Sequence, residues 1–128
     1  GLQGDVMFPG YVPDEELTLW YNAATVFAFP SLYEGFGMPV LEAQACGTPV
    51  LTSAYSALPE AAGDAALLVD PRETPAIAEG LHRLLTDQAL RETLRQRGPA
   101  RAARFTWPQT AAKTAAVYRR ALTEEHTQ

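Results

Sequence analysis

Hydrophobic residues along this chain fall into short continuous runs that alternate with longer segments of helical periodicity. The runs cover residues 6–8, 26–29, 49–52 and 66–69, and each is followed by Pro, Ser or Asp. An apolar run without alternation is typical of a strand buried on both faces of a parallel sheet. We therefore predict an α/β fold in which four parallel strands, with helices on both faces, form half of a doubly wound sheet.

The segments between and after these runs predict amphipathic helices. Residues 14–24 begin with three acids, which stabilise a helix N-terminus, and place Leu17 and Trp20 on an apolar face. Gly47 is expected to end a helix over 39–46, and Gly98-Pro99 to break one over 88–97. The other predicted helices cover residues 74–86 and 107–124.

The loop after the second predicted strand has the composition of an anion site. Loops at the C-terminal ends of parallel strands gather at one sheet edge, where open α/β sheets bind ligands. Gly35 and Gly37 permit φ > 0 and close approach of a ligand, and Pro39 suits the first position of the next helix. N–H groups that point out of a helix N-terminus favour phosphate. We expect these groups on Gly37, Met38, Val40 and Leu41.

Two carboxylates flank this predicted phosphate site. Glu34 precedes the helix and Glu42 lies about one turn inside it, so they are not neighbours on one helix face. Because an anion site needs no acids, we expect both carboxylates to accept hydrogen bonds from hydroxyls. A nucleotide-sugar, with phosphate between two polyol rings, fits this arrangement. A Gly-rich turn that caps a buried helix fits the same spacing.

Length and composition indicate one domain. The chain has 128 residues, and no apolar run approaches the roughly 20 residues of a membrane span. No signal peptide is recognisable, and a first residue of Gly1 indicates a processed or truncated start.

The charge distribution argues against nucleic acid as a partner. The net charge is −5 and the first basic residue is Arg72, whereas phosphate-backbone binding depends on Lys and Arg. A diphosphate site without a nearby cation is also incomplete. The arginines of residues 91–104 form a basic face, which we expect to be solvated, with contact to an anionic membrane as the alternative.

The sequence context of the histidines, the cysteine and two serines indicates structural roles. His82 and His126 have no metal-ligand spacing, so no metal is predicted. Cys46 is interpreted as a small core residue. Ser53 and Ser56 are interpreted as turn residues, with a hydroxyl that reaches a phosphate as the alternative.

The string EGFGMPVLEAQACGTPV, residues 34–50, resembles the E-x7-E element of retaining nucleotide-sugar glycosyltransferases of the GT-B fold, in particular glycosyltransferase family four, also called group 1. The resemblance extends over nearly the whole chain. Other landmarks are residues 8–17, Leu58-Pro59-Glu60, residues 63–71 and Phe105-Thr106-Trp107. It implies a Rossmann-like sheet, part of the C-terminal donor-binding domain.

The resemblance also implies roles for individual residues. Glu34 would hold the donor sugar near the reacting carbon as the catalytic residue, and Glu42 would accept from the ribose hydroxyls. The loop with Tyr11 and Val12 would line the nucleobase pocket, although Tyr11 can equally be a plain loop aromatic. Backbone groups at the helix start would contact sugar and diphosphate, in a donor site made of Gly35, Phe36, Gly37, Met38, Val40 and Leu41.

The implied organisation is a donor-binding domain over residues 1–106, without its first strand-helix units, and a C-terminal crossover helix over residues 107–128. The substrate would be a UDP- or GDP-linked sugar, and no cofactor is expected. The basic pair of such enzymes and their acceptor domain would lie outside this chain. We therefore expect the chain alone to be inactive and prone to self-association. Ala-rich composition and the use of Arg over Lys indicate a bacterial protein. A cytoplasmic location is expected, with peripheral contact to the inner membrane as an alternative.

Two other functions fit the same fold. A GT-B nucleotide-sugar epimerase would need catalytic acids and His outside this chain, and a non-catalytic domain would have kept the fold without the ligand.

Overall fold

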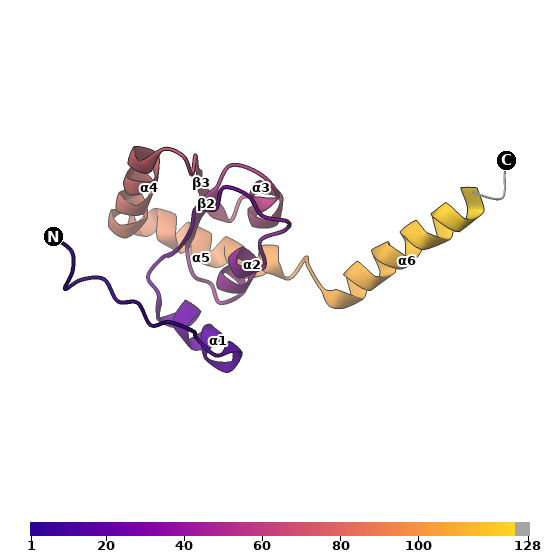
Figure 1. The fold of residues 1–128 in the computed structure, drawn as a ribbon, viewed down its shortest axis with the longest axis horizontal. Coiled ribbons are helices and arrows are strands. Elements are labelled where there is room, and N and C mark those ends of the chain that lie inside the picture. The colour runs from indigo at the N-terminus through magenta and orange to yellow at the C-terminus, as the bar shows by residue number, and fades with distance from the viewer. Residues whose placement is uncertain (125–128) are drawn as a thin grey trace.

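The computed structural model describes residues 1–124, which form a three-stranded sheet with helices around it and one helix that projects from this body (Figure 1). The elements in order are α1 (Asp14–Ala23), β1 (Phe27–Phe29), α2 (Met38–Ala45), β2 (Val50–Ser53), α3 (Leu58–Ala62), β3 (Ala66–Val69), α4 (Thr74–Thr86), α5 (Gln88–Ala102) and α6 (Trp107–Glu124).

The sheet is parallel, as predicted, and its strand order is β1-β2-β3. Phe27 pairs with Val50, and Val50 pairs in turn with Ala66, so the three carboxyl ends lie at one edge. All four residues of the central strand β2 are buried. Successive side chains of a strand point to opposite faces of its sheet. Accordingly, Val50 packs in a cluster with α2 and α3, and Leu51 in a cluster with α4 and α5. Helices thus cover both faces.

The predicted strand at residues 6–8 is absent. This segment has no strand assignment, and Met7 and Phe8 are 80% and 90% exposed. A strand forms by pairing its backbone with a neighbour, and none of the strands in residues 1–124 pairs with this segment. The buried-strand prediction was therefore wrong, because apolar composition does not supply a pairing partner.

The predicted break at Gly98-Pro99 is also wrong, since α5 continues to Ala102. Gly98 is buried where α5 crosses α2, and a Cβ built there would lie 2.8 Å from the carbonyl oxygen of Gln44. Helix hydrogen bonding resumes beyond the proline, where the N–H of Ala103 donates to the Pro99 carbonyl at 3.0 Å. We infer that close packing on α2 offsets the cost of an internal proline.

The five arginines do not form a uniformly solvated face. Arg91 donates to the carbonyls of Leu84 and Leu85 at the end of α4, at 2.8 and 2.7 Å. Arg101 donates from Nε to the carbonyl of Ala61 at 3.0 Å. At least two of these side chains thus satisfy backbone groups at helix ends.

Helix α6 occupies the predicted range and carries apolar side chains that remain exposed. Figure 1 shows it pointing away from the body after a short connection from α5. Trp107 and Tyr118 are 78% and 67% exposed. None of the helices in residues 1–124 is long and apolar enough to cross a membrane.

Candidate functional site

The loop between β1 and α2 joins the helix through a glycine that no other residue could replace without strain. Gly37 has φ +102° and ψ +46°, and a Cβ built there would lie 2.6 Å from Leu58 Cδ2. Gly35 differs, because its φ is not positive and a Cβ there would meet nothing within 4 Å. The helix begins at Met38, so Pro39 is its second residue rather than its first.

The N–H groups at the start of α2 are only partly available to a ligand. The Val40 N–H donates to the Gly37 carbonyl at 3.0 Å, and the side chains of Val40 and Leu41 lie in the core. The prediction of a free N–H at Val40 was therefore wrong, because the first helical turn closes on itself. Within residues 1–124, the N–H groups of Phe36, Gly37 and Met38 have no protein acceptor.

Glu42 is held by its side chain. The Tyr21 hydroxyl of α1 donates to Glu42 Oε2 at 3.0 Å, and the Thr48 hydroxyl donates to the Tyr21 carbonyl at 2.7 Å. The Tyr21 ring also meets Phe27 edge-on, with centroids 5.2 Å apart. Burial, reinforced by the hydrogen bond to Glu42, raises the pKa of Tyr21 well above its usual range. This contact fixes one oxygen of Glu42 and leaves Oε1 as an acceptor for a ligand hydroxyl.

Glu34 is held by its backbone instead. Its N–H donates to Ser56 Oγ at 3.1 Å, and its carbonyl accepts from the same hydroxyl at 2.7 Å. Its carboxylate has no hydrogen-bond or ion-pair partner in the described part of the chain. The sequence favoured a turn role for Ser56 and did not show this contact, which joins residues 22 positions apart.

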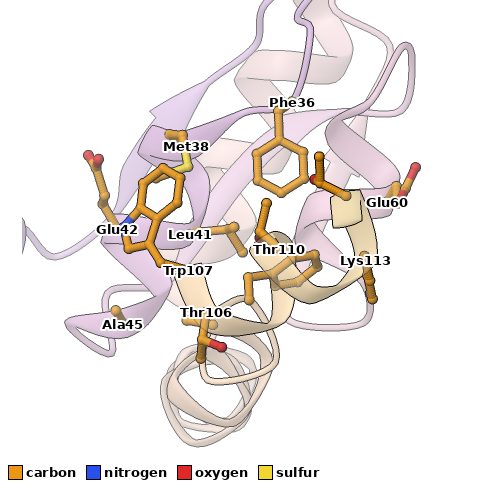
Figure 2. Close-up of a pocket in the computed structure, with 13 residues that line it drawn as sticks. Phe36, Met38, Leu41, Glu42, Ala45, Glu60, Thr106, Trp107, Thr110 and Lys113 are labelled. Atoms are coloured by element: carbon orange, nitrogen blue, oxygen red, sulfur yellow. The ribbon is translucent and has the colours of Figure 1, made fainter. Parts of the chain in front are cut away.

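Two cavities lie beside α2, and Glu42 borders both. The larger has a volume of about 540 Å³, and Figure 2 shows Glu42 and Glu60 on opposite sides of it, with the rings of Phe36 and Trp107 between them. The smaller, about 470 Å³, lies between α1 and α2 and includes the half-buried Cys46. Glu34 borders neither, so neither cavity is the phosphate site that the sequence predicts between the two acids.

Aromatic contacts join the loop to the start of α6. The Phe36 and Phe105 rings meet edge to face, with centroids 5.6 Å apart. The Arg101 guanidinium lies 4.9 Å from the Phe105 centroid and also donates to the Glu60 carbonyl. The sequence signalled both phenylalanines as family landmarks but did not show that they touch.

A polar cluster occupies the carboxyl edge of the sheet after β2 and β3. Asp70 accepts from the Tyr55 hydroxyl at 2.8 Å and from two guanidinium nitrogens of Arg72 at 3.0 and 2.9 Å. The hydrogen bonds from Arg72 hold the pKa of Asp70 well below its usual range. Arg72, the first cation of the chain, is thus already paired with a carboxylate.

The remaining predicted site residues are not brought to α2. Tyr11 is 85% exposed, and neither it nor Val12 borders either cavity. In residues 1–124, His, Cys, Asp and Glu form no group that could hold a metal. His82 is exposed, and His126 lies outside the described residues.

Comparisons with known proteins agree on one family. The family model described as glycosyl transferases group 1 matches residues 1–101. O-antigen chain mannosyltransferase B of Escherichia coli is 44% identical over 117 residues, which are 91% of this chain and 31% of that protein. D-inositol 3-phosphate glycosyltransferase of Frankia alni is 42% identical over 124 residues, 95% of this chain and 30% of that protein. The chain thus spans about a third of these relatives.

Solved structures show the same fold. Sucrose-phosphate synthase from Thermosynechococcus elongatus superposes with a TM-score of 0.83 at 36% identity, over 96% of this chain and 32% of that one. The C-terminal domain of a glycosyl transferase group 1 family protein (LpcC) from Francisella tularensis gives 0.70 at 32% identity, over 80% of this chain and 54% of that one. The Rossmann-like α/β prediction, as part of a GT-B C-terminal domain, is confirmed.

Proposed function

The chain belongs to the glycosyl transferases group 1 family, and from this premise we propose that it is the donor-binding part of a retaining glycosyltransferase. The whole enzyme would move a hexose from a nucleoside-diphosphate sugar to an acceptor hydroxyl. The observation that carries the proposal is the start of α2, where the N–H groups of Phe36, Gly37 and Met38 have no acceptor within residues 1–124, and where Glu34 and Glu42 lie on either side in sequence.

In this proposal the donor lies across the start of α2. The diphosphate accepts hydrogen bonds from the three N–H groups, next to the positive end of the helix dipole. Glu42 accepts from the ribose hydroxyls through the oxygen that Tyr21 leaves free. Glu34 accepts from hydroxyls of the sugar near the reacting carbon. As the sugar leaves, charge grows on the diphosphate, and donors fixed in advance stabilise it without reorganising.

The wider biological setting is part of the same proposal. Relatives named as mannosyltransferases support a mannosyl-like hexose and a role in polysaccharide synthesis. We propose UDP or GDP as the nucleotide, with Tyr11 and Val12 near the base, no metal, and a cytoplasmic location peripheral to the inner membrane. The Ala-rich composition and the excess of Arg over Lys support a bacterial source.

We also propose that the chain alone transfers no sugar. Its relatives are about three times its length, and an acceptor-binding domain and further cations for the diphosphate would come from the whole protein. The exposed apolar side chains of residues 6–8 and α6 should then drive weak self-association of the chain. Sedimentation of a monomer at high concentration would contradict self-association, and turnover by the chain would contradict its inactivity.

The experiment that tests the function is a titration of the chain with UDP and GDP, followed by NMR. Glu42→Ala should weaken binding by about 1–3 kcal/mol if Glu42 accepts from ribose. Glu79→Ala on α4 is the matched control, because it removes an exposed acid that borders neither cavity. Binding that is absent, or that Glu42→Ala leaves unchanged, would favour a non-catalytic domain of the same fold.

A further inference from the structure

Ser56 has a backbone conformation that is unusual for a residue with a side chain. Its φ is +61°, and within residues 1–124 it is the one non-glycine residue with positive φ. Such conformations are sparsely populated, and they persist where the surrounding contacts hold them. The contacts made by Ser56 are therefore informative.

The Ser56 hydroxyl satisfies both backbone polar groups of Glu34. It donates to the Glu34 carbonyl at 2.7 Å and accepts from the Glu34 N–H at 3.1 Å. A hydroxyl carries one donor hydrogen and two acceptor lone pairs, so a single side chain can make both bonds. Alanine or glycine at this position could make neither.

The segment that carries Ser56 is anchored to the carboxyl edge of β3. The Ala54 N–H donates to the Val69 carbonyl at 2.8 Å, and the Tyr55 hydroxyl donates to Asp70 at 2.8 Å. The Arg72 guanidinium lies 4.5 Å from the Tyr55 ring centroid and bonds to Asp70 as well. The position of the Ser56 hydroxyl is thus set by the sheet.

From these contacts we propose that Ser56 is a positioning residue, which fixes the Glu34 backbone and so sets the direction in which the Glu34 carboxylate meets the donor sugar. This inference rests on the proposed function, because the contact between Glu34 and the sugar belongs to it. In this inference Ser56 acts through Glu34, because its one hydroxyl hydrogen is given to the Glu34 carbonyl. Its loss should therefore affect the part of donor affinity that depends on the sugar, and spare the part that depends on the nucleoside diphosphate.

The test compares the affinity of the chain for GDP-mannose with that for GDP, and for UDP-glucose with that for UDP. We expect the cognate nucleotide-sugar to bind more tightly than its nucleoside diphosphate. Ser56→Ala should weaken nucleotide-sugar binding about fivefold, with the affinity for the nucleoside diphosphate within about twofold of the wild type. Hydrogen exchange at the Glu34 amide should accelerate in the same variant, because its acceptor is gone.

Two further variants separate the hydroxyl from other effects of the substitution. Ser56→Gly relieves the positive φ but also lacks the hydroxyl, so it should fold at least as well as Ser56→Ala and show the same loss. Ser31→Ala is the matched control, because it removes a hydroxyl from the Glu34 loop whose one partner within residues 1–124 is the Tyr33 carbonyl, at 3.2 Å. It should bind both ligands as the wild type does.

The outcomes distinguish this inference from the proposed function. If the wild type binds a nucleotide-sugar and both Ser56 variants bind it equally well, the inference is wrong and the function stands. An equal loss for nucleotide-sugar and nucleoside diphosphate would mean that Ser56 only maintains the loop, which also overturns it. A wild type that binds neither ligand, or does not discriminate between them, contradicts the function of Glu34, and the inference fails with it.

Discussion

The body of this domain, from β1 to α5, buries a set of large apolar side chains, whereas its two ends, residues 1–13 and α6, leave large apolar side chains exposed. In the body, Leu51, Leu58 and Leu84 are fully buried between the sheet and its helices. At the ends, Phe8 is 90% exposed and Trp107 is 78% exposed. An apolar sequence predicts that a segment favours burial, but a partner within the same chain decides whether burial occurs.

The largest effect should come from the centre of the body. Leu51→Ala removes a side chain of β2 that packs against the helices α4 and α5. The substitution should lower the unfolding free energy by about 2–5 kcal/mol because a cavity remains. Phe8→Ala is the matched change at an end and should cost less than about 0.5 kcal/mol. Denaturant unfolding measures both. Similar losses for the two variants would mean that residues 1–13 pack on the body in solution.

The same contrast explains how much of the fold the sequence predicts. The ranges of α4 and α6 follow from local periodicity and agree with prediction. The predictions for residues 6–8 and for the end of α5 were wrong. Whether residues 6–8 form a strand depends on a pairing partner, and the length of α5 depends on the close packing of Gly98 against α2. Local patterns specify elements, whereas contacts between distant segments decide which of them form.

The candidate site divides in the same way. The sequence identifies the loop, both acids and the helix start, because glycine, proline and acid spacing are local signals. It does not show that Tyr21 holds Glu42, or that Ser56 holds Glu34, since those partners are 21 and 22 residues away. The sequence also does not show that the Val40 N–H is occupied. That N–H donates to the Gly37 carbonyl within the first helical turn, and the residue types of the turn do not determine whether this bond forms.

A second, smaller effect is expected where the loop meets the body. Gly37→Ala should cost about 1–3 kcal/mol of unfolding free energy, because it places a Cβ at φ +102° and against Leu58. Gly35→Ala, two residues earlier and in open space, should be neutral or stabilise by up to about 1 kcal/mol. Thermal and denaturant unfolding measure both variants. An equal loss of unfolding free energy for the two would show that Gly35 is closely packed and not in open space.

A third effect concerns the contact between α1 and α2 and depends on pH. The pKa of Tyr21 is raised in the folded chain, so the folded state holds this proton more tightly than the unfolded state does. The stabilisation is complete below the unfolded pKa of about 10 and is lost as pH rises above it. Tyr21→Phe should cost about 0.5–1.5 kcal/mol at neutral pH.

This variant should also show a shallower loss of stability above pH 10 than the wild type. Tyr118→Phe on α6 is the control for the other region, since that side chain is 67% exposed. Circular dichroism measures the stability of each protein as a function of pH. If the stability of the wild type and of Tyr21→Phe falls in parallel above pH 10, Tyr21 does not cause this pH dependence.

The smallest effect is expected at the polar cluster on the carboxyl edge of the body. Arg72 holds the pKa of Asp70 below its usual range, so this carboxylate stabilises the fold above the unfolded pKa of about 3.9, and the stabilisation is lost as pH falls through the folded value. Both side chains are accessible to water, and screening by solvent keeps their contribution small. Arg72→Gln should move the NMR titration midpoint of the Asp70 carboxyl upward, whereas Arg83→Gln on α4 should leave it in place. An unmoved midpoint in Arg72→Gln would mean that the guanidinium and the carboxylate are separated by solvent, and that β3 alone then orders the segment leading to Ser56.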